Sequence, residues 1–285
     1  YASLPSVLSS PTCLGIQLIK NIMYSVFIVL DSPTSRMTRG SLPRTSFGAR
    51  MTIHDIMNFM KKNSENNKKI ELLSPAGDLP RLKTAVAFGA DAIYCGLPQW
   101  SLRNIREIQF NEETIREGLD FAHKKGVKVY VTCNIFPHES HLKLLKKDLA
   151  QLNTMGFDGI ILSDIGMLSL AREFAPDIPI HLSTQANTTN SEAIKMWQAL
   201  GVKRVILARE LSLFEIKRIH EAVPEMELEI FVHGAMCMAY SGNCTISNYT
   251  SGRDSNRGGC AHSCRFEYKL KFGNGKKGEN KEEEV

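Results

Sequence analysis

Residues 203–222 read KRVILARELSLFEIKRIHEA, and this stretch contains one complete strand-and-helix unit. Residues 203–208 are mostly apolar and include β-branched side chains, which predicts a buried strand. Residues 213–222 repeat apolar side chains at helical spacing, which predicts a helix. Arg209 and Glu210 fall between the two elements, so the unit places two charged side chains where a strand ends.

The same order of strand, loop and helix continues from about residue 70 to residue 232. Such a repeat, at a spacing of roughly 20–40 residues, predicts parallel strands joined by helical crossovers. The chain has no glycine-rich G-x-G-x-x-G or G-x4-G-K-S/T phosphate motif, which favours a barrel over a doubly wound sheet. We therefore expect an α/β fold of the (β/α)8 TIM-like barrel type. The predicted strands are residues 70–73, 91–95, 127–133, 159–162, 178–182, 203–208 and 228–232.

The predicted barrel has about seven β/α units and no convincing eighth strand, so we expect it to be incomplete and to expose two strand edges. These units occupy residues 69–236, and a cysteine-rich segment follows at 237–272. Residues 273–285 are polar, contain glycine and have no apolar period, which predicts a disordered tail. We expect residues 1–68 to form a disordered or targeting-like extension.

The N-terminal extension carries most of the net charge. The formal charge of the chain is +5, and residues 1–50 contribute +4 of it. Their Ser- and Arg-rich composition is compatible with an organelle transit peptide, while Met51 is an alternative start of the protein. We expect a cytoplasmic location, with an organelle as the alternative if residues 1–50 are a transit peptide. The apolar run at 22–30 is too short to span a bilayer, so no membrane partner is expected.

Four cysteines follow the last predicted strand with the spacing C-x6-C-x15-C-x3-C. Disulfides are typical of short secreted chains, whereas 285 residues with 43% hydrophobic composition can bury a sizeable core. The context therefore favours a metal centre. Zinc and an iron–sulfur cluster both remain open, although only the last two cysteines have the tight spacing of a structural zinc site. The predicted metal ligands are Cys237, Cys244, Cys260 and Cys264.

Polar side chains occur where the predicted strands end, and in a β/α barrel these ends surround the active site. Gln185 and Asn187 are two residues apart and share a face, so both can point at one ligand, although either could instead cap the next helix. His233 is either catalytic or a structural histidine. The catalytic candidates are Gln185, Asn187, Glu210 and His233, and the candidates for substrate contact are Arg209, Ser74 and Asn134.

Arg209 is the candidate for binding a small dicarboxylate, because a guanidinium binds carboxylate in a bidentate geometry. The alternative is that it pairs with a neighbouring charge. Arg209 and Glu210 are adjacent, so along a strand their side chains point in opposite directions. Ser74 precedes a Pro-Ala-Gly sequence and could serve only to shape that turn.

Basic and aromatic residues are interleaved within and just after the cysteine segment. Residues 51–285 carry a formal charge of only +1, so any contact with RNA must use a local patch. Aromatic side chains such as Tyr249, Phe266 and Tyr268 could stack on the bases of single-stranded RNA. An ordinary solvated surface is the alternative. The candidate RNA-binding residues are Arg253, Arg257, Arg265 and Lys269.

Several long motifs resemble the peptidase U32 family. The most specific is EIFVHGAMC at 229–237, which is followed by GNCTIS at 242–247. The resemblance extends over about residues 69–272. Its other motifs are LLSPAGD at 72–78, GADAIYCGLPQWSLR at 89–103, IHLSTQAN at 180–187, RVILARELS at 204–212 and CAHSCRFEY at 260–268.

The resemblance implies a barrel fold, a [4Fe–4S] cluster on the four cysteines and a role in RNA modification. Family members of this type are linked to prephenate-dependent formation of 5-hydroxyuridine at the wobble position of tRNA. The expected partners are therefore the anticodon region of tRNA and prephenate, for which Arg209 is our own candidate. The sequence departs from the family in lacking a segment around a K-I-E-G-R motif.

Two other functions remain as alternatives. The first is a collagenase-like peptidase, as the family name implies, although the chain has neither an H-E-x-x-H zinc motif nor a G-x-S-x-G elbow. A cysteine nucleophile would also need a paired base. The second is a non-catalytic RNA-binding module.

Overall fold

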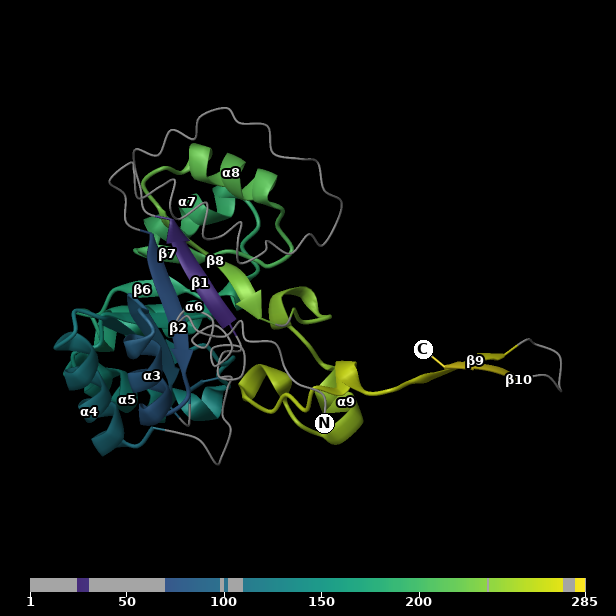
Figure 1. Cartoon of the computed structure of the whole chain (residues 1–285). Coiled ribbons are helices and arrows are strands. Elements are labelled where there is room, and N and C mark those ends of the chain that lie inside the picture. The colour runs from purple at the N-terminus through teal and green to yellow at the C-terminus, as the bar shows by residue number, and fades with distance from the viewer. Residues whose placement is uncertain are drawn as a thin grey trace, which may run out of the picture.

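The computed structural model describes residues 25–30, 70–97, 100–101, 110–234, 236–273 and 280–284. Its central feature is a closed barrel in which the strands follow one another in chain order from β1 to β8 (Figure 1). Each strand lies next to its neighbours in the sequence, as short crossover connections require. The strands are β1 Ser25–Leu30, β2 Glu71–Ala76, β3 Ala92–Gly96, β4 Lys128–Cys133, β5 Gly159–Leu162, β6 Ile180–Leu182, β7 Arg204–Ile206 and β8 Glu227–Gly234.

Helices follow the parallel strands and cover the outside of the barrel (Figure 1). Most of them begin at a side chain that accepts a hydrogen bond from the first turn, as Asp78 does from the Arg81 N–H at 2.9 Å. The helices are α3 Leu79–Ala87, α4 Glu112–His123, α5 Leu142–Asn153, α6 Ile165–Phe174, α7 Ser191–Ala199 and α8 Leu213–Ala222, with a short helix η1 Glu139–His141 before α5. Among the described residues, no helix has the length and hydropathy that a membrane crossing requires.

Strands β2 to β8 pair in parallel, which confirms the predicted run of seven β/α units and the TIM-like α/β fold. Strand β1 is antiparallel to both of its neighbours: Phe27 lies opposite Leu73 of β2, and Ile28 lies opposite Ile230 of β8. The two edges that we expected to be exposed are therefore both paired.

Two sequence predictions are corrected by β1. The barrel is closed rather than incomplete, and residues 25–30 form a strand although we assigned residues 1–68 to a disordered or targeting-like extension. The physical reason is that an apolar, β-branched run finds hydrogen-bond partners along two free strand edges at once. The rest of residues 1–68 lies outside the described part of the chain.

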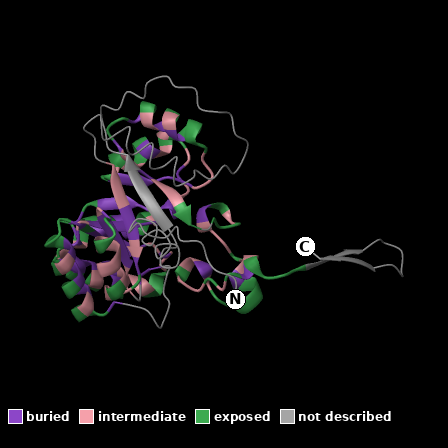
Figure 2. Cartoon of the chain, viewed as in Figure 1, coloured by how far each residue is buried: buried purple, intermediate pink, exposed green. Residues whose placement is uncertain are grey.

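The barrel divides the apolar side chains into two groups, because successive residues of a strand point to opposite faces. Outside, the strands pack against the helices in one large core that includes Ile93, Val131 and Ile160. Inside the barrel lies a smaller core, and buried residues follow the strands through the centre of the molecule (Figure 2). This inner core consists of Leu73, Ala92, Tyr94, Tyr130, Ile161 and Ile206, with Phe231 packed against it.

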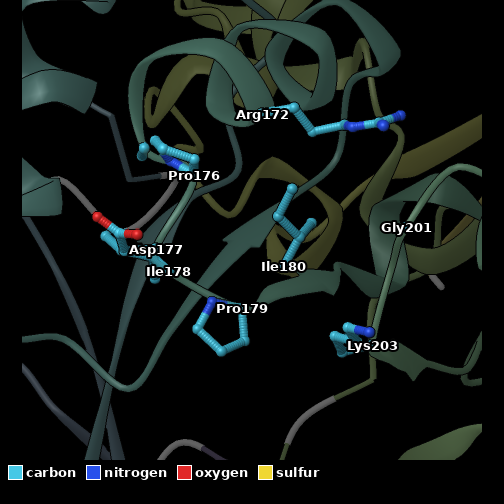
Figure 3. A pocket seen from close by; sticks show the side chains of 9 residues that line it. Arg172, Pro176, Asp177, Ile178, Pro179, Ile180, Gly201 and Lys203 are labelled. Carbon is cyan, nitrogen blue, oxygen red and sulfur yellow. The ribbon is translucent and has the colours of Figure 1, made fainter.

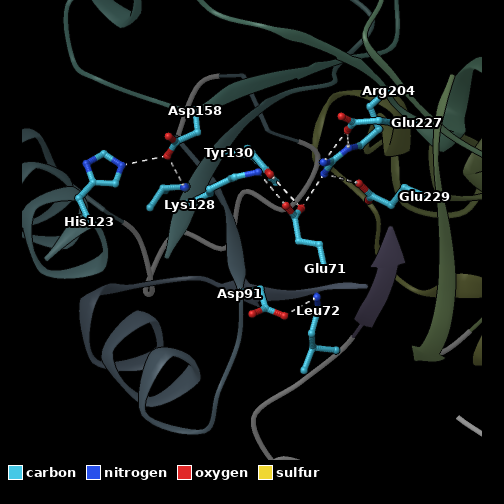
Figure 4. A network of polar contacts seen from close by, with 11 residues as sticks. Glu71, Leu72, Asp91, His123, Lys128, Tyr130, Asp158, Arg204, Glu227 and Glu229 are labelled. Atoms are coloured by element: carbon cyan, nitrogen blue, oxygen red, sulfur yellow. Dashed lines mark hydrogen bonds and ion pairs between the residues drawn. The ribbon is translucent and has the colours of Figure 1, made fainter. Parts of the chain in front are cut away.

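Beside the inner core lies a network of charged side chains around Arg204 of β7 (Figure 4). The Arg204 guanidinium is 2.8 Å from Glu71 of β2, 2.8 Å from Glu227 and 3.5 Å from Glu229, both of β8. The Tyr130 hydroxyl donates a hydrogen bond of 2.9 Å to Glu71. Burial disfavours the ionised form of Glu71, but Arg204, Tyr130 and Lys128 together lower the pKa of this carboxyl. The network thus joins strands that are far apart in the sequence.

The C-terminal part consists of short helical turns followed by a hairpin. The turns are η3 Tyr240–Gly242, α9 Ile246–Ser251, η4 Ser255–Arg257 and η5 Ser263–Arg265, and the hairpin is β9 Lys269–Gly273 with β10 Asn280–Glu284. The hairpin corrects the prediction that residues 273–285 are disordered, within the part that the structure describes. The two strands pair antiparallel, with Glu282 opposite Lys271 and Glu284 opposite Lys269 in the register.

The Glu229 carboxyl is fully buried, and burial raises its pKa from 4.5 to about 8 against the opposing attraction of Arg204. Between these two values the folded chain keeps a proton that the unfolded chain has released. The free energy of unfolding should therefore fall as the pH rises, by up to about 1.4 kcal/mol per pH unit. Glu229→Gln removes this titration and should flatten that part of the profile, which urea unfolding at several pH values measures.

The control for this experiment is Glu221→Gln, which changes a carboxylate on α8 whose side chain is 62% exposed. This variant should keep the slope of the wild type. Parallel profiles for the wild type and Glu229→Gln would contradict the prediction.

Candidate functional site

The C-terminal ends of β4, β5 and β6 bring three polar residues together at the mouth of the barrel. The Ser163 hydroxyl donates to the main-chain carbonyl of Asn134 at 2.9 Å and lies 3.4 Å from the Gln185 Oε1. Gln185 lies in a short turn, η2 Thr184–Ala186, and its side chain is nearly buried. The Ser163 hydroxyl therefore lies between the Gln185 side chain and the main chain of Asn134.

Arg209 enters the same mouth from the loop after β7. Its guanidinium carbon lies 5.3 Å from the centre of the Phe231 ring, a cation–π contact that fixes the side chain. A Cβ added at Gly242 would lie 3.2 Å from Arg209 Nη2 and 3.8 Å from Gln185 Nε2. The Arg209 Nε is buried without a hydrogen-bond partner, which is costly for a charged donor unless a ligand supplies an acceptor.

Two asparagines also present unpaired oxygens at this end of the barrel. Asn187 follows η2 in a left-handed conformation, with a φ of 53°, and its Oδ1 is buried without a partner. Asn243 donates from Nδ2 to the main-chain carbonyl of Gln185 at 3.2 Å, while its own Oδ1 is unpaired. The mouth thus combines an unpaired guanidinium donor with unpaired amide acceptors.

Three other predicted residues have different surroundings. Both oxygens of the Glu210 carboxylate accept hydrogen bonds from Ser241, at 2.6 Å each. Ser74 lies within β2, next to the inward-facing Leu73, so its buried side chain is on the opposite face of the sheet from the inner core. His233 is exposed near the end of β8.

Sequence reasoning did not select four further residues that shape the mouth. Ser163 lies at a predicted strand end, among the polar residues found there, whereas nothing in the local sequence of Phe231 distinguishes it from an ordinary core residue. Ser241 and Asn243 lie between the first two cysteines, and a Ser-Gly-Asn sequence before Cys244 was the available signal for a tight, functional turn.

The four predicted metal ligands are free thiols on the segment that follows β8. Cys237 and Cys260 are exposed, whereas Cys244 and Cys264 are half-buried. Within the described part of the chain, no three His, Cys, Asp or Glu side chains are grouped closely enough to hold a metal ion. The donor set suits an iron–sulfur cluster or zinc chemically, but its geometry as placed here does not fit either.

Cys244 is held in a polar frame, in which its main chain and its sulfur both take part in hydrogen bonds. Its main-chain N–H donates to the Asn256 Oδ1 at 3.3 Å, and the Asn256 Nδ2 donates back to its carbonyl at 3.1 Å. The Ile246 N–H lies 3.4 Å from the Cys244 Sγ, in a position to stabilise a thiolate. The Phe136 N–H donates to the Asn256 carbonyl at 3.1 Å, which links this frame to the loop after β4.

One known family matches most of the sequence of the barrel and all of the cysteine segment. The model of peptidase family U32 matches residues 77–285. The chain belongs to peptidase family U32. The resemblance that the sequence motifs indicated is therefore confirmed.

Three curated relatives are named for different activities. The tRNA hydroxylation protein P of Escherichia coli is 52% identical over 205 residues, which cover 72% of this chain and 45% of that protein. The 23S rRNA 5-hydroxycytidine synthase of Escherichia coli is 38% identical, covering 74% of this chain and 31% of that protein. The collagenase of Porphyromonas gingivalis is 31% identical, covering 72% and 51%. The U32 chain spans about half the length or less of these relatives.

The cysteine segment of this U32 chain is also rich in exposed apolar side chains. Half of the large hydrophobic side chains that are exposed in the described residues lie between Met236 and Tyr268. Tyr249 on α9 is 92% exposed, and Figure 2 shows this end of the molecule mostly as exposed. Three arginines lie on the same segment and are exposed: Arg253, Arg257 and Arg265.

These arginines differ in how they are held. Arg257 forms a bond of 2.7 Å with Asp254, and Arg265 lies 3.5 Å from the main-chain carbonyl of Met236. The side chain of Lys269 lies outside the described part of the chain. Arg253, Arg257 and Arg265 are therefore exposed on the same segment of the chain as the exposed aromatic side chains.

A cavity of about 320 Å³ lies at the opposite end of the barrel, near the start of β6 (Figure 3). Its walls include Pro179, Ile180 and Lys203. None of the predicted site residues lines it, so it is separate from the mouth.

Gly259 is required by the close approach of two chain segments. Its N–H donates to the Asp254 carbonyl at 2.7 Å, and an added Cβ would lie only 2.6 Å from the same oxygen. Gly259→Ala should therefore displace the turn that carries Cys260 and lower the free energy of unfolding by about 1–3 kcal/mol. Thermal and urea unfolding of the two proteins measure this change.

Gly252→Ala is the matched control on the same segment. Gly252 has a φ of 63°, but an added Cβ would have no atom within 4 Å, so only backbone strain is introduced. This variant should lose about 1 kcal/mol. A Gly259→Ala protein as stable as the wild type would show that the turn adjusts freely.

Proposed function

We propose that this U32 chain is part of an RNA-hydroxylating enzyme that acts on tRNA. The observation that carries the proposal is the unpaired Nε of Arg209 in a mouth lined by Gln185 and approached by the loop between Cys237 and Cys244. Two U32 relatives are named for RNA hydroxylation, and the one with 52% identity is named for tRNA. A barrel mouth lined by polar groups is where such chemistry belongs.

The small-molecule partner in this proposal is a dicarboxylate, and prephenate is our candidate. Phe231 holds the Arg209 guanidinium on one side, which leaves its remaining N–H groups to bind a carboxylate. The unpaired Oδ1 atoms of Asn187 and Asn243 would accept from hydroxyl groups of the ligand. The product would be 5-hydroxyuridine at the wobble position.

The cofactor in this proposal is an iron–sulfur cluster bound by the four cysteines of the segment that follows β8. Because no three of these thiols are grouped as placed, cluster binding requires the segment to close around the metal. Such closure is expected where metal binding is coupled to local folding. The chain itself contributes the thiolates, and the Ile246 N–H already faces the sulfur of Cys244.

The RNA partner would contact the exposed face of the cysteine segment. Its arginines, Arg253, Arg257 and Arg265, would contact phosphates, and Tyr249 and Phe266 would stack on unpaired bases of an anticodon loop. Lys269 remains a candidate for the same role. A cytoplasmic location belongs to the same proposal, since tRNA modification is the function inferred.

The two buried thiols of the barrel argue against the peptidase alternative, because neither has the properties of a catalytic nucleophile. Cys95 and Cys133 are fully buried, and burial raises the pKa of the Cys95 thiol to about 12 and that of Cys133 as well. Neither is an activated nucleophile. The relative named as a collagenase is also the least similar of the three.

Arg209→Ala, made in the full-length protein, should lower 5-hydroxyuridine in tRNA on the order of 100-fold, because the ligand carboxylate loses its partner. Arg209→Lys should be intermediate, since it keeps the charge but not the bidentate geometry. Mass spectrometry of tRNA nucleosides measures the product, and calorimetric titration with prephenate measures the affinity.

Arg218→Ala is the matched control, because the Arg218 guanidinium lies 5.9 Å from the Phe214 ring on the outside of α8. It should leave both measurements unchanged. Wild-type hydroxylation with an unchanged prephenate affinity in Arg209→Ala would overturn the role given to Arg209.

The cluster is tested by purifying the protein without oxygen and recording its iron, its sulfide and its visible spectrum. We expect broad absorbance near about 400 nm and roughly four irons per chain, as for a Cys-bound [4Fe–4S] centre. Cys244→Ser should abolish both, whereas Cys13→Ser, outside the cysteine segment, should not. A colourless protein that contains zinc would contradict the cluster and indicate a structural zinc site instead.

A further inference from the structure

We propose that Glu210 is a positioning residue that fastens the cysteine loop, residues 237–244, to the mouth of the barrel beside Arg209. The hydrogen bonds between Glu210 and Ser241 are called the clasp below. The purpose of the clasp rests on the proposed function, but its geometry does not. It gives Glu210 a different role from the catalytic one that the sequence suggested.

The clasp is a two-point contact. The Ser241 main-chain N–H donates to Glu210 Oε1 at 2.6 Å, and the Ser241 hydroxyl donates to Oε2 at 2.6 Å. The same hydroxyl accepts a bond of 3.3 Å from the Arg209 N–H. Bonds to a carboxylate are roughly twice as strong as those between neutral groups, and Ser241 is fully buried. Both carboxylate oxygens are therefore committed to the loop.

The backbone of the loop needs such a restraint. Ser241 has a φ of 45° and a ψ of 31°. This is a left-handed backbone conformation that residues other than glycine rarely adopt. A non-glycine residue keeps this conformation only where its surroundings fix it. The clasp fixes two polar groups of Ser241, its N–H and its hydroxyl.

The residues next to Ser241 are held against the ligand-binding side chains. A Cβ at Gly242 would lie 3.2 Å from Arg209 Nη2, and Asn243 donates to the Gln185 carbonyl at 3.2 Å. Cys237 and Cys244 are the first and last residues of this loop. The position of Glu210 therefore sets both the wall of the Arg209 site and the approach of two thiols to it.

The experiment compares Glu210→Ala with Glu210→Gln in the full-length protein. A glutamine amide at this position can accept from the Ser241 N–H and donate to its hydroxyl, so Glu210→Gln keeps the loop in place without the charge. Glu210→Ala releases the loop. In metal-free protein, Glu210→Ala should raise the rate of iodoacetamide alkylation at Cys244 about tenfold or more and leave Cys260 and Cys264 near wild type.

Measuring the hydroxylated tRNA distinguishes a positioning role of Glu210 from a catalytic one. Glu210→Gln should retain most of the tRNA product and Glu210→Ala should lose most of it, whereas a catalytic carboxylate would make both variants equally inactive. Equal inactivity, or unchanged alkylation at Cys244 in Glu210→Ala, would overturn the proposal. So would a uniform rise at all four cysteines, which indicates general loosening.

Two further variants keep the test decisive. Ser241→Ala removes the hydroxyl half of the clasp and should reproduce the Cys244 effect in part, even where Glu210→Ala does not fold. Glu221→Ala on the outside of α8 is the exposed control and should change nothing. A selective Cys244 effect without any hydroxylation by the wild type would refute the proposed function and leave the clasp standing.

Discussion

The fold depends on a buried arginine that joins the first and the last of the parallel strands. Arg204 on β7 is 3% exposed and contacts the carboxylates of Glu71 on β2 and Glu227 on β8, and the Glu71 contact spans 133 residues of sequence. Seven parallel strands can form an open, twisted sheet as easily as a curved one. An arginine that must find carboxylates across the lumen favours the curved arrangement, because removing a partner from a buried ion pair costs several kcal/mol.

The curvature decides which side chains meet at the mouth. Once β2 and β8 approach each other, β1 can pair with both, and the ends of β6, β7 and β8 point toward one centre. Arg209 then lies close to Phe231, and Gly242 lies close to both Arg209 and Gln185, although these side chains come from three different strands or strand ends. The charged network at one end of the barrel and the candidate site at the other end thus both depend on the closure of the sheet.

The parallel strands were predictable because each carries its own apolar run and turn residues, so local pattern was sufficient. Strand β1 was not, since its apolar run was judged only against the length of a bilayer, and its partners lie in distant segments. In the candidate site, Arg209 and Gln185 were predicted from their place at strand ends, and the structure brings both close to Gly242. Ser74 was misplaced because a shift of one residue along a strand moves a side chain to the other face. The contact between Ser241 and Glu210 was not predictable, because it depends on a left-handed backbone conformation at Ser241 that the sequence does not reveal.

The cysteine segment is ordered by a different physical principle from the barrel. Side-chain bonds to the backbone hold its turns, as Asn256 does for Cys244 and the Ser247 hydroxyl does for the Ala261 N–H at 3.1 Å, while its aromatic side chains are largely exposed. Such a segment has little apolar burial of its own and should open at low free energy. A cluster or an RNA partner would therefore find a segment that can rearrange. The clasp, in contrast, keeps the loop between Cys237 and Cys244 in register with Arg209, so rearrangement is confined to the part that lies beyond the mouth.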